Sequence, residues 1–178
     1  MSMSIKATCR IRWAAHNSGP RSRAQLKWIV LHDTEGGSAA SVASQFASQN
    51  ATASTHLVVD DKECYRMVPD LVIPWGAPGG NTAGLHIEQV GWARWSRATW
   101  LAHEKTLRRS AYKAARWSKM YGIPLRWVGK WGLKLGRKGV TTHNELSRAF
   151  LPGGHTDPGP NFPKDVWMRY AKEYRAAL

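Results

Sequence analysis

The stretch Leu26-Lys27-Trp28-Ile29-Val30-Leu31-His32 decides the fold class. A short, nearly continuous apolar run bounded by polar residues predicts a buried strand. The run ends in a polar loop over residues 33–37, and Ser38 then offers an N-cap for a helix whose apolar positions include Val42 and Phe46. A strand, a loop and a helix in succession form a building unit of α/β domains.

Further strands and helices follow along the chain. Two strand-like runs at residues 55–60 and 63–68 flank an Asp-Asp-Lys turn and predict a β-hairpin. Beyond it we expect a loop over 69–84, a strand over 85–90, a helix over 99–121, a basic loop over 125–139, a short strand over 140–144 and a closing helix over 164–177. Strands interleaved with helices predict a single α/β domain, residues 1–178, with one central sheet.

The composition is ordinary except for its charge. Hydrophobic residues make up 43% and charged residues 21% of the chain, which is typical of a globular domain. The net charge of +14 indicates a polyanionic partner, which could be a nucleic acid, an anionic membrane or an acidic cell-wall polymer. No run approaches the ~20 apolar residues of a membrane span, so we expect no membrane insertion. Residues 1–15 lack the apolar core of a signal peptide, so we expect synthesis in the cytoplasm.

The two cysteines, Cys9 and Cys64, are too few for a disulfide framework, and neither belongs to a CxxC pair. A single disulfide between them remains an alternative. We expect two separate buried thiols.

The segment His155-Thr156-Asp157-Pro158-Gly159-Pro160 suggests a metal ligand. Proline fixes φ and glycine adopts conformations that other residues resist, so Asp157 is expected on a stiff turn that holds its carboxylate in place. His32 and His143 each end a predicted strand and are the best-placed imidazole partners. Two imidazoles and a carboxylate suit one zinc ion with an open position, although each histidine alone is more often structural than a ligand.

The order of several motifs resembles that of the zinc-dependent N-acetylmuramoyl-L-alanine amidases of the type-2 amidase and peptidoglycan-recognition-protein fold, which include many bacteriophage endolysins. The resemblance spans roughly residues 26–168. Its pieces are Ile29 to Gly36, Ser54 to Asp60, Trp75-Gly76-Ala77 with Asn81, Ile87 to Gly91, Gly139 to His143, and the Asp157 turn with Phe162-Pro163. It implies a mixed sheet flanked by helices, with zinc at one end of the sheet held by His32, His143 and Asp157.

The resemblance also implies roles for other residues. Glu88 falls where the family has its catalytic glutamate, which would deprotonate water and pass the proton to the leaving amine; the alternative is a strand glutamate that faces solvent or an arginine. His155 lies where many members have an oxyanion-stabilising lysine, and it could instead only brace Asp157. His56, Trp75, Asn81 and Thr34 would support the ligands or contact substrate. Gly76 stands where the family often has histidine, and His86 has no supporting context, so we expect it to be an ordinary core or surface residue.

The expected function is hydrolysis of the amide between N-acetylmuramic acid and L-alanine in peptidoglycan, as a monomeric phage endolysin that reaches the wall after holin-dependent release. The expected partners are peptidoglycan and acidic wall polymers, to which the basic residues Arg126, Lys130, Lys134, Arg137 and Lys138 would be attracted. A second hypothesis is a non-catalytic peptidoglycan-recognition module. We expect no specific nucleic-acid binding, because no helix-turn-helix, zinc-finger or RNA-recognition signature accompanies the charge.

Overall fold

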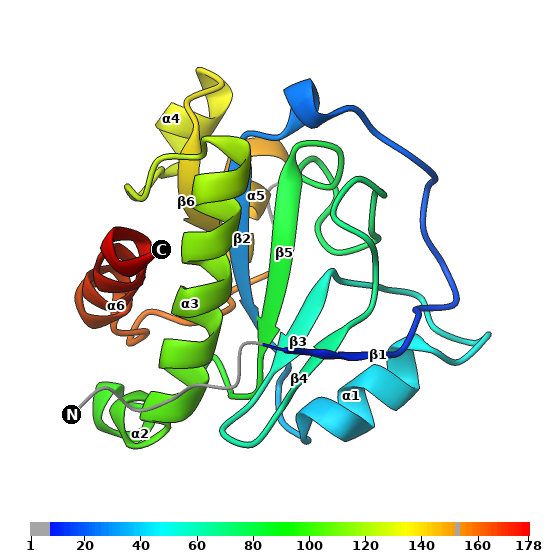
Figure 1. Cartoon of the computed structure of the whole chain (residues 1–178), viewed down its shortest axis with the longest axis horizontal. Helices are drawn as coiled ribbons and strands as arrows, with labels where there is room; N and C mark the ends of the chain where they lie inside the picture. The colour runs from blue at the N-terminus through cyan, green and yellow to red at the C-terminus, as the bar shows by residue number, and fades with distance from the viewer. Residues whose placement is uncertain (1–7, 152–153) are drawn as a thin grey trace.

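The computed structural model describes residues 8–151 and 154–178, so part of the basic N-terminal stretch, residues 1–7, lies outside the described residues. Within them the chain forms one six-stranded mixed sheet in the order β1-β4-β3-β5-β2-β6 (Figure 1). The strands are β1 (Arg10–Ile11), β2 (Trp28–Asp33), β3 (Leu57–Val59), β4 (Cys64–Arg66), β5 (Gly84–Gln89) and β6 (Gly139–Thr142). The predicted α/β domain with a central mixed sheet is confirmed.

Strand β2 lies inside the sheet, between β5 and β6, and is buried as its apolar run predicts. It pairs in parallel with β5 from Trp28↔Gly84 to Asp33↔Gln89, and in parallel with β6 on its other side. Every residue of β2 is buried. Strand β3 continues the sheet parallel to β5, and β4 closes the predicted hairpin antiparallel to β3. The carboxyl ends of β2, β5 and β6 therefore meet at one edge of the sheet.

One face of the sheet packs against helices α3 (Glu104–Tyr121) and α6 (Lys164–Ala177), with α2 (Arg97–Ala102) at the end of α3 (Figure 1). Strand residues such as Ile29 and Ile87 join Leu107 and Trp167 of these helices in the largest apolar cluster. Gly122, with φ of 67°, caps α3, which ends at the predicted residue, Tyr121. The single helix predicted over 99–121 is wrong in one respect: His103 leaves helical geometry between α2 and α3, where its Nδ1 lies 2.7 Å from Asp61 Oδ2.

The opposite face is covered by α1 (Ala39–Phe46), α4 (Lys130–Lys134) and α5 (His143–Phe150), together with the loop that follows β4. Two of these helices were not predicted. The basic stretch expected as a loop contains the short α4, and the strand expected over 140–144 ends at Thr142. The Thr142 hydroxyl accepts a hydrogen bond from Glu145 N, so it caps α5 and makes His143 the first residue of a helix.

A disulfide joins Cys9 to Cys64, so the expectation of two separate thiols is wrong. Strand β1 pairs in parallel with β4, with Arg10 opposite Tyr65, and this pairing brings the preceding residue of each strand together. The two Cα atoms lie 4.6 Å apart. The bridge ties the short edge strand to the sheet across 55 residues of sequence.

None of the helices in residues 8–151 and 154–178 combines the length and apolarity needed to cross a membrane.

Candidate metal centre

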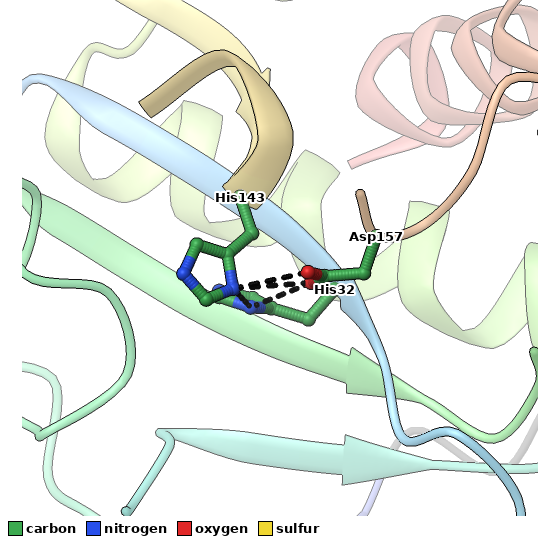
Figure 2. A group of neighbouring side chains, drawn as sticks. All are labelled: His32, His143 and Asp157. Carbon is green, nitrogen blue, oxygen red and sulfur yellow. Dashed lines mark hydrogen bonds and ion pairs between the residues drawn. The ribbon is translucent and has the colours of Figure 1, made fainter. Parts of the chain in front are cut away.

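Three side chains converge at the carboxyl edge of the sheet (Figure 2). His32 comes from the end of β2, His143 from the start of α5 and Asp157 from the loop before α6. Their candidate ligand atoms all lie within 4.8 Å of one another, and all three residues are buried. The Nδ1 atoms of His32 and His143 are 3.2 Å apart, and each is 3.2 Å from Asp157 Oδ2.

The fold explains how distant residues meet. Leu31 of β2 lies opposite Thr142 of β6, so the next residue of each chain segment, His32 and His143, emerges at the same edge. Asp157 is held by its own turn. Its carbonyl oxygen accepts from Asn144 N, and Gly159, with φ of 91°, approaches the backbone of Ala93 so closely that a Cβ there would lie 2.0 Å from the Ala93 oxygen.

This donor set fits a divalent cation. A proton cannot satisfy two imidazole nitrogens and a carboxylate oxygen that face one point, whereas one cation satisfies all three. Burial lowers the pKa of His32, which favours the neutral ring that a metal requires. Burial acts to raise the pKa of Asp157, but hydrogen bonds from His143 and His32 outweigh it and hold that pKa below its usual range. Two nitrogens and one oxygen, with room for a further ligand, are typical of zinc sites in hydrolases.

Glu88 lies beside these ligands. It sits opposite His32 in the β2–β5 register, and its Oε1 is 3.7 Å from His32 Nδ1. The side chain is only 12% exposed, and its Oε2 has no hydrogen-bond partner among the described residues. Burial, followed by the nearby charges of Asp157 and Asp33, raises the pKa of Glu88 well above its usual value. The carboxylate therefore faces the metal-ligand group rather than solvent or an arginine.

A cleft of about 470 Å³ opens over the ligands. His155 and Thr34 both line it, as do residues of α1. The His155 ring stacks on His143 with centroids 3.7 Å apart, and its Nδ1 lies 3.7 Å from Asp157 Oδ1. Burial and the neighbouring His143 lower the pKa of His155. The Thr34 hydroxyl donates to Gly36 O, so it fixes the loop after β2.

The other three predicted residues lie outside the cleft lining. His56 is fully buried, and its Nδ1 accepts the backbone N–H of His86. Trp75 is 39% exposed and stacks on the imidazole of a neighbouring loop, His16. Asn81 Oδ1 accepts the backbone N–H groups of Gly76 and Ala77, and so shapes the loop that forms one wall.

Two residues at the site were not predicted. Asp33 lines the cleft, and burial raises its pKa to about 7. His86, expected to be unremarkable, is fully buried with its Nδ1 2.9 Å from His32 Nε2. The sequence could have indicated His86, because it lies two residues before Glu88 and alternate residues of a strand share a face.

Comparisons with known proteins identify the family and support the fold. The family model described as N-acetylmuramoyl-L-alanine amidase matches residues 22–160, whereas a comparison with curated protein sequences gives no match. Among solved structures, hydrolase AmiA of Staphylococcus aureus, in complex with its ligand, has a TM-score of 0.72 at 18% identity, covering 94% of this chain and 86% of that one.

Two further structures show the same fold. PlyL has a TM-score of 0.66 at 17% identity, with 96% and 99% of the two chains covered. The catalytic domain of XlyA has a TM-score of 0.64 at 19% identity, with 94% and 99% covered. The family match spans most of the sheet and all three candidate ligands: the chain belongs to the N-acetylmuramoyl-L-alanine amidases, enzymes that hydrolyse an amide bond of bacterial peptidoglycan.

Proposed function

We propose that this amidase depends on one zinc ion held by His32, His143 and Asp157, and that it cleaves the amide between the lactyl group of N-acetylmuramic acid and L-alanine. One observation carries the proposal. Three ligand atoms converge within 4.8 Å at the floor of a cleft, next to a buried carboxylate oxygen that has no hydrogen-bond partner among the described residues. Buried polar groups without partners cost stability, so such an arrangement is typical of a functional site.

Zinc bound there would supply Lewis acidity for the scissile carbonyl and for water. The protein's own groups perform the proton transfers. Glu88 takes a proton from the attacking water as the C–O bond forms, and returns it to the nitrogen of L-alanine as the C–N bond breaks. Burial raises the pKa of Glu88, so the carboxylate is a stronger base toward the attacking water, and the proton it takes up is retained until the C–N bond breaks.

We assign His155 to the substrate oxygen. Its ring lies on the cleft wall against His143, and more than half of its side chain is exposed. An N–H of this ring would donate to the oxyanion of the tetrahedral intermediate. The stacking on His143 limits where the ring can point, which keeps the donor close to the reacting carbonyl.

The basic surface supports attraction to acidic wall polymers. On α4, the ammonium groups of Lys130 and Lys134 lie 5.0 and 5.3 Å from the ring centre of Trp131. Trp131 is 67% exposed and Leu135 is 72% exposed, so this helix presents apolar side chains inside a cationic surface. Such a surface suits anionic polymers that also expose sugar rings, and a net charge of +14 strengthens the attraction.

We further propose that the protein is a monomeric phage endolysin, made in the cytoplasm and given access to the wall by a holin. Support comes from the surface charge and from an endolysin of Bacillus subtilis, solved as a mutant, which has the same fold with a TM-score of 0.64 at 20% identity. Expression inside a bacterial host with and without a holin tests this role. Rapid lysis only in the presence of the holin is expected, and lysis independent of it would contradict the role.

The chemistry is tested with purified peptidoglycan. The wild-type protein should release stem peptides with a new L-alanine amino terminus, detected by mass spectrometry. Chelation should stop the release and added zinc should restore it. Release of sugar reducing ends instead, or full activity after the metal has been removed, would overturn the proposal.

A further inference from the structure

His86 takes no part in the proposed proton transfers, yet it contacts a metal ligand. Its ring is fully buried, with Nδ1 2.9 Å from His32 Nε2. The ring centres of His86 and His32 are 5.1 Å apart, and those of His86 and His56 are 5.8 Å apart. His86 therefore lies between a ligand that faces the cleft and a histidine in the interior.

The space for this ring exists because two neighbouring positions are glycine. A Cβ on Gly76 would lie 2.8 Å from His86 Nδ1 and 3.1 Å from its Cγ, and a Cβ on Gly84 would lie 2.5 Å from His86 Nε2. Neither glycine has a positive φ, so the backbone conformation at both positions suits other residues, although a Cβ on Gly84 would also lie 2.8 Å from the backbone oxygen of Gly80. Glycine is required there for space and not for conformation.

When a metal is bound, only one of the two rings can be the donor in the hydrogen bond between His32 and His86. A metal held by His32 Nδ1 requires a lone pair on that atom, so the proton of the ring sits on Nε2 and is donated to His86 Nδ1. The remaining nitrogen of His86, Nε2, then carries a proton, but it has no partner among the described residues. A buried donor without a partner costs about 1–3 kcal/mol, so an apolar side chain would be the more stable choice at this position.

Two further contacts hold His86 in place. His56 Nδ1 accepts the backbone N–H of His86 at 3.0 Å, and the guanidinium of Arg21 lies 2.6 Å from His56 Nε2. Arg21 itself donates to the backbone oxygens of Asp70 and Gly84, among others. Arg21 and His56 therefore fix the backbone of β5 at His86, whose ring contacts the metal ligand His32.

We propose that His86 is a positioning residue that selects the tautomer and ring orientation of His32 for metal binding, and that Gly76 supplies the space this requires. The inference rests on the proposed zinc site. It makes residues 76 and 86 a coupled pair, because any side chain at 76 displaces the ring at 86.

A matched pair of substitutions separates positioning from packing. His86→Asn keeps an acceptor near the place of Nδ1, and His86→Leu keeps the volume but removes the acceptor. Loss of an outer hydrogen-bond partner typically weakens metal binding by about 10–100-fold. We expect His86→Leu to weaken zinc binding to that extent, measured by competition with a chromophoric chelator, without lowering the melting temperature of the metal-free protein. His86→Asn should restore the affinity to within about tenfold of wild type.

The coupling with Gly76 gives a second test that does not depend on whether the leucine variant folds. Gly76→Ala should weaken zinc binding in the wild-type background and have no effect in the His86→Gly background. In the metal-free protein, where no metal fixes the tautomer, the imidazole nitrogen NMR signals should show His32 protonated on Nε2 to a larger extent in wild type than in His86→Leu.

The outcomes separate this proposal from the one on which it rests. If wild-type protein binds zinc and both His86→Leu and Gly76→Ala bind it equally well, the positioning role is wrong and the zinc amidase assignment stands. Equal weakening by leucine and asparagine would also overturn it, because packing alone would then explain the effect. If wild-type protein binds no zinc, both proposals fall.

Discussion

The two faces of the sheet differ although they share the same strands. On the face covered by α3 and α6, β2 and β5 contribute Ile29, Leu31, Leu85 and Ile87 to an apolar cluster. On the other face the same two strands contribute His32, His86 and Glu88, in a cleft or directly behind it. Alternation along a strand makes this division possible, because neighbouring residues point to opposite faces.

Along each of these strands, residues that stabilise the fold therefore alternate with residues that can take part in the reaction. The helix face buries apolar side chains, which stabilises the fold. The cleft face buries one carboxylate oxygen of Glu88 and the Nε2 of His86, neither of which has a hydrogen-bond partner among the described residues, and each costs stability. We therefore expect substitutions on the two faces to affect different measurements.

The largest effect on activity is expected for Asp157→Ala. Removing this ligand should abolish zinc binding and lower peptidoglycan hydrolysis by at least about 10³-fold, because the metal contributes several kcal/mol to the transition state. Asp165→Ala is the matched control, since that carboxylate is exposed on α6 and pairs with Arg97. Metal analysis and hydrolysis rates of both variants test this prediction. An active Asp157→Ala protein would show that the reaction does not need the metal centre.

Glu88→Gln should separate catalysis from metal binding. The amide retains the shape of the side chain but cannot take up a proton, so we expect a fall in kcat of about 10²–10⁴-fold. Zinc affinity should stay near that of wild type, because Glu88 is not one of the three ligands. A rate within tenfold of wild type would show that another group is the base.

His155 should give a smaller effect that depends on hydrogen bonding. Loss of one oxyanion donor in His155→Ala should lower kcat by about 10²–10³-fold, whereas His155→Lys should remain active. Zinc content serves as the control for both variants. Equal rates for wild type and the alanine variant would limit His155 to bracing Asp157.

On the helix face, Leu107→Ala should change stability and leave the site intact. Leu107 is fully buried against the sheet, and truncation there should cost about 2–5 kcal/mol of unfolding free energy. Denaturant unfolding measures this loss. The zinc affinity of the folded variant should equal that of wild type, and a large change in affinity would contradict the separation of the two faces.

The smallest predicted effect is a pH dependence of the metal-free protein. Folding raises the pKa of Glu88 above its ordinary 4.5, so the folded state retains a proton that the unfolded state has lost. Stability therefore falls as the pH rises from about 4.5 toward the folded pKa. Glu88→Gln lacks this loss, so its stability relative to wild type should increase with pH over that range. A constant difference between pH 4 and 8 would contradict the prediction.

Local sequence patterns correctly predicted the helices and strands that depend only on residues close together in the chain. The apolar run that ends at His32 predicted a buried strand, and the helix over residues 164–177 has the predicted bounds. Features that depend on contacts between residues far apart in the chain were not predicted. His103 breaks a helix by bonding to Asp61, and the disulfide from Cys9 follows from the pairing of β1 with β4.

The sequence by itself determined which side chains could bind a metal and which segment forms a fully buried strand, because residue type and hydrophobic periodicity are local properties. Only the tertiary structure decided that His32 and His143, 111 residues apart, meet at adjacent parallel strands, and that His86 stands behind them. The physical reason is strand register. Which residues face one another across a sheet depends on how all its strands pair, and no single segment contains that information.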